Sequence, residues 1–287
     1  MDTFAIRALT PPQFPPLLVE IPQPPKNLWA MGALPPQNHK LLAVVGSRKY
    51  TTYGKQVVDH LLKGLSGYPV GIISGLALGI DSLAHEAALA HGLYTMAVPG
   101  SGLDESVIYP ASHKRLARRI VEAGGGLLSE FEPTLPAAKW TFTQRNRIMA
   151  GMCHATLLIE AAERSGTLIT ARMATDYNRE LMVVPGSIFS KTAAGTHQFL
   201  KLGATPVTDA IDILHVLGIE PHATQTLTLP ELSPLETKVI TLLNEPTDRD
   251  TLIRLLALPV HEAATLLMQM ELQGLITVDN NCYRSSI

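Results

Sequence analysis

Short apolar runs separated by segments of helical spacing are the feature that most restricts how this sequence can fold. The runs are continuous rather than alternating, which is typical of parallel strands buried on both faces of a sheet. They occupy residues 41–46, 70–74, 93–100, 126–130, 155–159 and 180–186. Strands that alternate with helices in this way need right-handed crossovers, which cover both faces of the sheet with helices. The sequence therefore predicts a doubly wound, Rossmann-like α/β domain with a parallel sheet over residues 41–217.

The first forty residues are rich in proline and differ from the region that follows. Proline fixes φ and removes a backbone donor, which disfavours helices and central strands. Apolar residues such as Phe14, Leu18 and Trp29 are interspersed among the prolines. We therefore expect residues 1–40 to form an extended arm packed on the main domain, with an SH3-type ligand as the alternative.

The C-terminal region has a separate pattern of short helices followed by a hairpin. Residues 218–230 have no periodicity and contain proline, which predicts a linker. Residues 231–287 then show a hairpin at 275–284 after three helical segments, at 234–243, 248–256 and 260–273. This order predicts a small winged-helix domain. Its third helical segment has no lysine or arginine, so it suits a protein contact or a dimer interface better than a DNA groove.

Composition and charge leave a nucleic-acid partner open. The 287 residues carry a formal charge of −2, with eight acids against four bases in residues 226–287, so the rest of the chain is slightly basic. Local patches rather than net charge steer a polyanion. The two cysteines have no metal or redox spacing, and the chain shows neither a signal pattern nor a run long enough to cross a membrane. These features predict a cytoplasmic protein without metal or membrane contact.

The region with the most functional signals runs from residue 139 to residue 174. Its pattern predicts a polar lead-in, a helix over 146–152, a buried strand over 155–159 and a second helix that begins at Thr167. A turn with Gly166 before that helix exposes backbone N–H groups, and the helix dipole favours an anion there.

Four residues before the buried strand combine positive charge with an aromatic ring: Lys139, Phe142, Arg145 and Arg147. Single-stranded nucleic acid is bound by cations along its backbone and by rings that stack on its bases, each stack contributing about 1–3 kcal/mol. If the lead-in is extended, Trp140 and Phe142 point to opposite faces and one ring is exposed. The alternative is a buried Phe142 beside solvated cations, or arginines that fix the loop.

Gly46, Ser47 and Arg48 follow the first predicted strand. In an open α/β sheet, ligands bind outside the carboxyl ends of the strands, so this turn is well placed for a phosphate. A plain turn with a solvated arginine is the alternative. The glycine-rich segment 100–110 has the same two interpretations, a phosphate cradle or a long loop.

Catalytic and cofactor signals are weak. Asp81 and His85 have i,i+4 spacing but no third metal ligand, which favours an N-cap aspartate and a packed histidine. Glu160 is either a general base or a carboxylate that holds its loop. The sequence has no complete dinucleotide fingerprint and no nucleophile–base pair. It therefore predicts a protein without catalytic residues, cofactor or metal.

Together the motifs resemble the DNA-processing protein A (DprA/Smf) family of bacteria. The resemblance rests on VVGSR (44–48), ISGLALGID (73–81), FTQRNRIMAG (142–151), SGTLITARMA (165–174) and GTHQFLKLGA (195–204). It implies a dimeric, non-catalytic protein that binds single-stranded DNA without sequence preference, protects incoming DNA and helps to load RecA recombinase in natural transformation. The family's DNA surface corresponds here to Gly46, Ser47, Arg48, Lys139 and Phe142, with Gly166 and Thr167 beside them.

Two departures and two rival functions accompany this resemblance. Many members carry a helical, SAM-like domain where this sequence predicts the proline-rich arm, and His197 stands where the family usually has asparagine. The first rival is a nucleotide or nucleoside-monophosphate hydrolase of the lonely-guy type, although the loop at 163–170 lacks that family's paired glycines and matching glutamate. The second is a winged-helix transcription regulator, which the acidic third helix disfavours.

Overall fold

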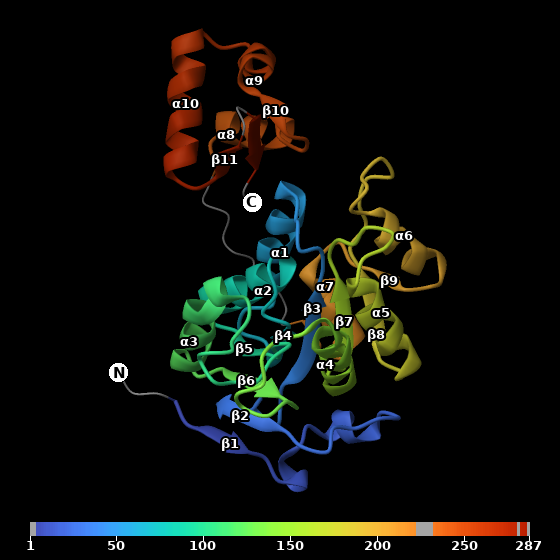
Figure 1. Ribbon diagram of the computed structural model, residues 1–287. Helices are drawn as coiled ribbons and strands as arrows, with labels where there is room; N and C mark the ends of the chain where they lie inside the picture. Colours follow the sequence, from blue (N-terminus) through green and yellow to red (C-terminus); the bar gives the residue numbers. More distant parts are fainter. Residues whose placement is uncertain (1–3, 222–231, 280–281, 286–287) are drawn as a thin grey trace. The chain divides into compact units, whose positions relative to one another are not determined.

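The computed structural model describes residues 4–221, 232–279 and 282–285 of the chain. The chain forms two compact units, residues 1–221 and residues 222–287 (Figure 1). Most of the predicted linker falls on residues 222–231, which lie outside the described residues.

The first unit is built on a nine-stranded sheet with the order β1-β2-β6-β5-β4-β3-β7-β8-β9. Seven of these strands are parallel: β3 (Lys40–Val45), β4 (Val70–Ser74), β5 (Tyr94–Ala97), β6 (Gly126–Ser129), β7 (Ala155–Leu158), β8 (Glu180–Val183) and β9 (Thr205–Pro206). The strand order runs outward from β3 in both directions, so the sheet is doubly wound and reverses between β3 and β7. The predicted Rossmann-like fold is confirmed.

Helices cover both faces of this sheet. They are α1 (Thr52–Gly64), α2 (Ile80–Ala90), α3 (Lys114–Glu122), α4 (Lys139–Met152), α5 (Thr167–Asp176), α6 (Ala194–Lys201) and α7 (Ala210–Leu217). One apolar core joins α1, α2 and α7 to the sheet, and a second joins α4, α5 and the N-terminal segment to it. Because β3–β9 pair in parallel, the carboxyl ends of these seven strands meet at one edge of the sheet.

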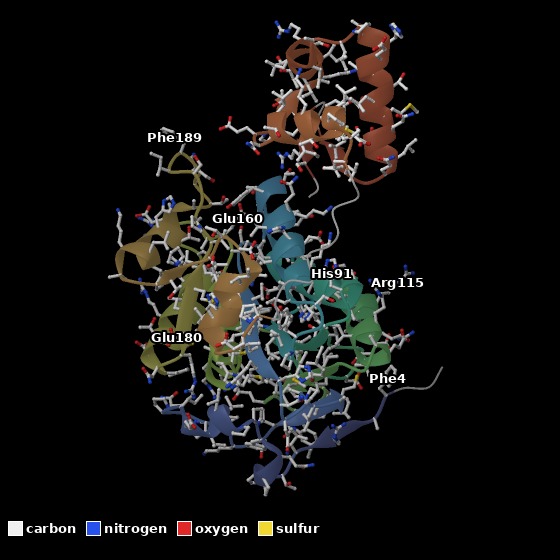
Figure 2. All side chains as sticks on the ribbon, turned by 180° about the vertical axis from the view of Figure 1, so that it is seen from behind. Phe4, His91, Arg115, Glu160, Glu180 and Phe189 are labelled. Atoms are coloured by element: carbon white, nitrogen blue, oxygen red, sulfur yellow. The ribbon has the colours of Figure 1, made fainter. Side chains whose placement is uncertain are left out.

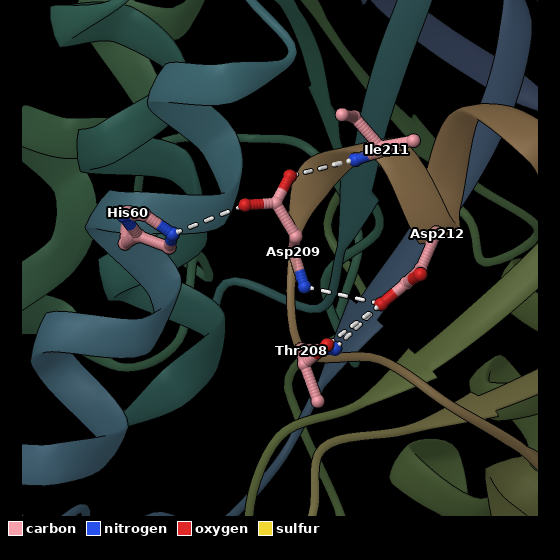
Figure 3. A network of polar contacts seen from close by, with 5 residues as sticks. All are labelled: His60, Thr208, Asp209, Ile211 and Asp212. Carbon is pink, nitrogen blue, oxygen red and sulfur yellow. Dashed lines mark hydrogen bonds and ion pairs between the residues drawn. The ribbon is translucent and has the colours of Figure 1, made fainter.

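Helix α7 begins at Ala210, where two aspartates accept hydrogen bonds from backbone N–H groups at and before its first turn. Asp209 accepts a hydrogen bond from the Ile211 N–H at 3.0 Å, and Asp212 accepts one from the Thr208 N–H at 2.8 Å (Figure 3). Asp209 also lies 3.8 Å from His60 of α1. The Asp209–His60 contact links the start of α7 to α1.

The proline-rich segment packs on the main unit and also adds strands to its sheet. β1 (Ile6–Ala8) pairs antiparallel with β2 (Trp29–Gly32), and β2 pairs antiparallel with β6, at the lower edge in Figure 1. Three short 3-10 helices complete the unit: η1 (Pro11–Gln13), η2 (Pro16–Glu20) and η3 (Ala111–His113). The sequence predicts an extended arm but not these two strands, because three- and four-residue strands are too short to show a period.

Helix α4 is longer than predicted, and the segment before residue 146 is helical rather than extended. It begins at Lys139 rather than near Asn146. The run of β-branched and aromatic residues at its start suggests an extended chain, but its buried positions repeat with a helical period: Thr141, Arg145, Ile148, Met149 and Met152. Two of these are polar, so the period is hidden in the sequence. The predicted alternation of Trp140 and Phe142 across a strand is therefore wrong.

The second unit has the winged-helix order that the sequence predicts. It consists of α8 (Pro234–Leu242), β10 (Thr247–Asp248), α9 (Arg249–Leu256), α10 (Val260–Leu272), β11 (Ile276–Asp279) and β12 (Cys282–Ser285). The strands form a sheet of order β10-β12-β11, and Val239, Leu252 and Leu267 lie in its separate core. Among the described residues no single helix could cross a membrane; only α9 and α10 together, across a 113° bend, have that length and composition.

Candidate nucleic-acid interface

The turn after β3 is held in place by contacts with the start of α2. The Ile80 N–H donates to the Ser47 carbonyl at 3.1 Å, and Gly79 has a φ of +91°, which an L side chain rarely adopts. A Cβ atom at Gly79 would lie 2.2 Å from the Ser47 carbonyl oxygen, so only glycine allows this approach. The Ser47 hydroxyl accepts from the Lys49 N–H at 3.1 Å and donates to the Lys49 carbonyl. Both contacts hold the turn, and they leave the Arg48 side chain exposed.

Arg48 lies on the ring of Phe142. Its Cζ atom is 5.3 Å from the ring centroid, within the range of a cation–π contact. Gly100 makes room for the ring, because a Cβ atom there would lie 2.6 Å from Phe142 Cδ1. The Tyr109 ring packs against Phe142 at 5.7 Å between centroids. Arg48 and Phe142, almost a hundred positions apart in the sequence, therefore lie side by side in the fold.

Lys139 completes this group. It is exposed and precedes Phe142 by three residues on α4, so both side chains lie on the same side of the helix. We call Arg48, Tyr109, Lys139 and Phe142 the Phe142 cluster. Tyr109 is the member that sequence reasoning missed; its only signal is a tyrosine within the glycine-rich segment after the third parallel strand.

Arg145 is not part of this surface. Its residue surface is 4% exposed, and its guanidinium donates to the Val98 carbonyl after β5. A Cβ atom at Gly75 would lie 2.1 Å from its Nη1 atom, so the guanidinium also fills the space beside the loop after β4. Burial lowers the pKa of Arg145 to about 10, against the opposite effect of the Asp81 carboxylate. Of the two predicted roles, contact with DNA or fixing a loop, the structure shows the second.

Asp81 and His85 are both buried in α2. Asp81 is inside the helix, whose N-cap is Gly79, so the predicted N-cap role is wrong. Burial raises the pKa of Asp81, and the Arg145 charge opposes that shift. His85 is packed as predicted, with Nδ1 2.8 Å from the Thr95 hydroxyl. Residues 4–221, 232–279 and 282–285 contain no cluster of three or more His, Cys, Asp or Glu side chains suited to a metal.

Arg147 also makes internal contacts. It forms an ion pair with Glu130, just after β6, and donates to the Gln23 carbonyl at 2.6 Å. Burial raises the pKa of Glu130, and the charge of Arg147 opposes that shift. Arg147 therefore ties the N-terminal segment to the main unit, while the exposed cations of the Phe142 cluster face solvent.

The turn before α5 adjoins the turn after β3. The Thr167 hydroxyl donates to the Gly46 carbonyl at 3.0 Å, and the Ser165 hydroxyl donates to the Thr167 hydroxyl. Gly166 is exposed, with no atom within 4 Å of an added Cβ. The predicted helix start at Thr167 is confirmed, and its position brings Gly166 and Thr167 beside Gly46.

Glu160 holds loops together rather than facing a nucleophile. Its buried carboxylate accepts from the Thr51 N–H at 2.9 Å, the Thr51 hydroxyl at 2.6 Å and the Thr192 hydroxyl at 3.1 Å. A Cβ atom at Gly54 would lie 2.4 Å from the carboxylate, so α1 packs directly on it. His197 donates to the Gly186 carbonyl at 3.0 Å, which is also a contact within the loops.

Comparison with known proteins identifies the family. The family model described as DNA recombination-mediator protein A matches residues 5–218, and the one described as DprA winged helix domain matches residues 222–279. The chain belongs to the DprA/Smf family. The resemblance drawn from the motifs is thereby confirmed.

Individual members of the family are similar over most of the chain. Protein Smf of Escherichia coli is 36% identical over 274 residues, which cover 92% of this chain and 72% of Smf. DNA processing protein DprA of Streptococcus pneumoniae is 41% identical over 197 residues, 69% of this chain and 68% of that protein.

Solved structures of the family have the same fold. The X-ray structure of DprA from Streptococcus pneumoniae has a TM-score of 0.69 and 37% identity, and covers 77% of this chain and 76% of its own. DNA processing protein A from Helicobacter pylori, a structure described for its single-stranded DNA binding mode, has a TM-score of 0.65 and 28% identity. It covers 75% of this chain and 96% of its own.

Proposed function

We propose that this DprA/Smf protein binds single-stranded DNA without sequence preference at the Phe142 cluster. The observation that carries this proposal is the exposed Arg48 guanidinium in cation–π contact with the half-buried Phe142 ring, with Lys139 exposed three residues earlier on the same helix. Guanidinium planes and aromatic rings both stack on unpaired bases, and exposed cations follow the phosphates. None of these contacts reads a base edge, so the site does not distinguish sequences.

The turns around the cluster contribute backbone groups. Gly46 and Ser47 are fixed next to Gly166 and Thr167, where α5 begins at the carboxyl edge of the sheet. A phosphate beside Arg48 would meet the positive end of that helix dipole. The single-stranded DNA binding mode described for the Helicobacter pylori relative supports this use of the fold.

From the family we infer the wider role of the protein. It protects incoming single-stranded DNA, acts as a homodimer in the cytoplasm and helps to load RecA recombinase during natural transformation. Relatives named DNA processing protein DprA support the DNA-processing part of this role. Sedimentation of the purified protein tests the dimer. The ATPase rate of RecA on DNA coated with single-strand-binding protein, with and without this protein, tests the loading.

No catalytic step belongs to the proposal. The carboxylate best placed for general base chemistry is Glu160, and both of its oxygens accept hydrogen bonds from threonines of the protein. The hydrolase alternative therefore lacks an unengaged carboxylate at that position to act as general base. Release of free base from nucleoside monophosphates by the purified protein would restore it.

Direct binding tests the function. The native protein is titrated into labelled oligothymidine and a labelled duplex, and the complex is competed with unlabelled single strands of other sequences. We expect tight binding to the single strand, weaker binding to the duplex, and equal competition by the different sequences. Absent binding to the single strand, or competition by one sequence only, contradicts the proposal.

A further inference from the structure

Three loops at the carboxyl edge of the sheet are joined by hydrogen bonds next to the Phe142 cluster. Glu160, after β7, accepts from Thr51, before α1, and from Thr192, in the loop after β8. The Ala161 N–H donates to the Thr192 carbonyl at 2.7 Å, and the Tyr53 hydroxyl donates to the Pro185 carbonyl at 2.7 Å. The loops therefore form one continuous surface that begins directly after Arg48.

A pocket of about 470 Å³ opens between these loops. Apolar atoms form most of its wall, with Ile159, Val184 and Ala193 among the lining residues. Six residues with hydroxyl groups also line it, and several of these hydroxyls donate to acceptors within the protein: Thr51, Tyr53, Ser187, Ser190, Thr192 and Thr196. The one ionisable acid in the lining is Glu160, and the lining has no lysine or arginine. A carboxylate disfavours a phosphate, whereas a mainly apolar wall with a few polar groups suits the face of a nucleobase.

Aromatic rings and cations surround this pocket. Tyr53 lines it and is 47% exposed, and Phe189, on the loop that forms its other side, is 91% exposed. Figure 2 shows Phe189 at the tip of that loop, pointing away from the sheet, at the same end of the unit as Glu160. The exposed cations on these loops are Arg48, Lys49, Arg164 and Lys191, with Glu163 as the exposed acid. Rings interleaved with cations are the pattern of a single-strand path.

We propose that the Tyr53 pocket and the Phe189 ring form a second nucleobase subsite for the strand that is held at the Phe142 cluster. The strand crosses the turn after β3, with its phosphates toward Arg48 and Lys49. One base enters the pocket beside Tyr53, and a neighbouring base stacks on Phe189. This inference rests on the proposed function, but it assigns to DNA a loop that the motif analysis leaves unused.

A nucleobase is favoured over a protein partner by the chemistry of the surroundings. The apolar surface at the tip consists of Phe189 and Ile188, the latter 80% exposed, and the next positions are polar or charged. A patch of two side chains is small for a protein docking site. It is sufficient for one stacked base, and the flanking Lys191 supplies charge for the adjoining phosphate.

The test compares oligothymidines of two lengths on the full chain. The short one, about 4 nucleotides, occupies the Phe142 cluster alone, and the long one, about 16 nucleotides, reaches both subsites. The variants are Phe189→Ala, Phe189→Trp, Tyr53→Leu and Phe142→Ala. Ile188→Ala is the matched control, because it removes an exposed apolar side chain from the same loop without removing a ring.

We expect Phe189→Ala and Tyr53→Leu to weaken binding of the long strand by at least fivefold and to leave the short strand unchanged. Phe189→Trp keeps the native affinity, and Ile188→Ala binds both strands like the native protein. Light-induced cross-linking of an iodouracil-substituted long strand is expected to label the peptide that contains residues 185–192.

Each failure has a separate meaning. If the native protein binds neither strand, the proposed function fails. If Phe142→Ala loses both strands but Phe189→Ala matches the native protein on the long one, only the second subsite is overturned. A change in sedimentation of Phe189→Ala with unaltered binding of the long strand would identify the tip as a protein contact and would also overturn the subsite.

Discussion

Arg145 and Lys139 lie less than two turns apart on α4 and have opposite surroundings. Arg145 is buried beside Asp81 and the Val98 carbonyl, whereas Lys139 is exposed at the start of the helix. A buried charge depends on its partner, because an unpaired one costs several kcal/mol, while an exposed charge is screened by water. The same residue class therefore stabilises the fold at one position and is available to DNA at the other.

The first prediction at the residue scale concerns stability. Arg145→Met removes the buried guanidinium that donates to the Val98 carbonyl, so we expect the free energy of unfolding to fall by about 1.5–3 kcal/mol, as for other hydrogen bonds of charged groups. Urea unfolding at neutral pH measures the loss. Lys139→Ala is the control and should change stability by less than about 0.5 kcal/mol, as for other exposed positions. Equal effects of the two substitutions would refute the internal role of Arg145.

His85 makes the stability of the first unit depend on pH. Burial lowers its pKa to about 3 in the folded protein, from 6.5. Below pH 6.5 the unfolded chain therefore binds a proton that the folded protein does not, and stability falls as the pH falls toward 3. At about 1.4 kcal/mol per pH unit, acidification from pH 6.5 to pH 5 costs about 2 kcal/mol. In urea unfolding, the free energy of unfolding of His85→Gln should fall by about 2 kcal/mol less than that of the native protein between pH 6.5 and pH 5. The same pH dependence in both proteins would contradict the lowered pKa of His85.

At the scale of elements, the site depends on turns that separate strands bring together. The turn after β3 is fixed by α2 beneath it and by Thr167 of α5 beside it. Loops at the carboxyl ends of neighbouring strands carry function because the sheet positions them rigidly. The orientation of Arg48 is therefore set by helices whose own sequences lie far from it.

Thr167→Val tests this dependence. The substitution keeps the shape of the side chain and removes the hydroxyl that donates to the Gly46 carbonyl. Without this hydrogen bond the turn has to be ordered when DNA binds, at a cost of about 1 kcal/mol, so we expect oligothymidine affinity to fall about fivefold. Thr175→Val removes a hydroxyl bond within the same helix, to the Ala171 carbonyl, and should leave affinity unchanged. Equal affinity of both variants would show that the turn does not need Thr167.

The sequence predicts the strands and helices of the parallel sheet well, because continuous apolar runs mark buried strands directly. It fails at α4, where Thr141 and Arg145 occupy buried positions that a pattern of apolar residues cannot reveal. The same polar burial explains why the candidate residues near the RNR sequence separate: Lys139 is exposed and Phe142 half-buried, whereas Arg145 and Arg147 make internal contacts. Tyr109 escapes prediction because its contact with Phe142 is purely tertiary.

At the scale of the whole molecule, the chain has two units with separate cores, and the candidate DNA site lies in the first. The strands, turns and rings of the Phe142 cluster all lie within residues 1–221. The winged-helix unit has its own apolar core, and its α10 contains no lysine or arginine. A helix without these cations has little attraction for phosphates. We therefore assign the proposed single-strand binding to the first unit.

Removal of residues 222–287 tests this division. Because none of the cluster residues is lost, we expect the remaining chain to bind oligothymidine with native affinity and an unchanged salt dependence. Fluorescence anisotropy across a salt series measures both quantities. A large loss of affinity in a truncated protein that is still folded by circular dichroism would assign part of the DNA surface to the winged helix.

The most direct test of the DNA site compares Lys139→Ala and Phe142→Ala with the native protein, by anisotropy of labelled oligothymidine across a salt series. Lys63→Ala is the charge-matched control, because Lys63 is exposed at the last turn of α1, away from the carboxyl edge. Loss of one phosphate contact should reduce the salt slope by about 0.7 in Lys139→Ala. Loss of one stack should weaken binding by about 1–3 kcal/mol in Phe142→Ala, with the slope kept. If both variants bind like Lys63→Ala, the DNA site lies elsewhere on the molecule.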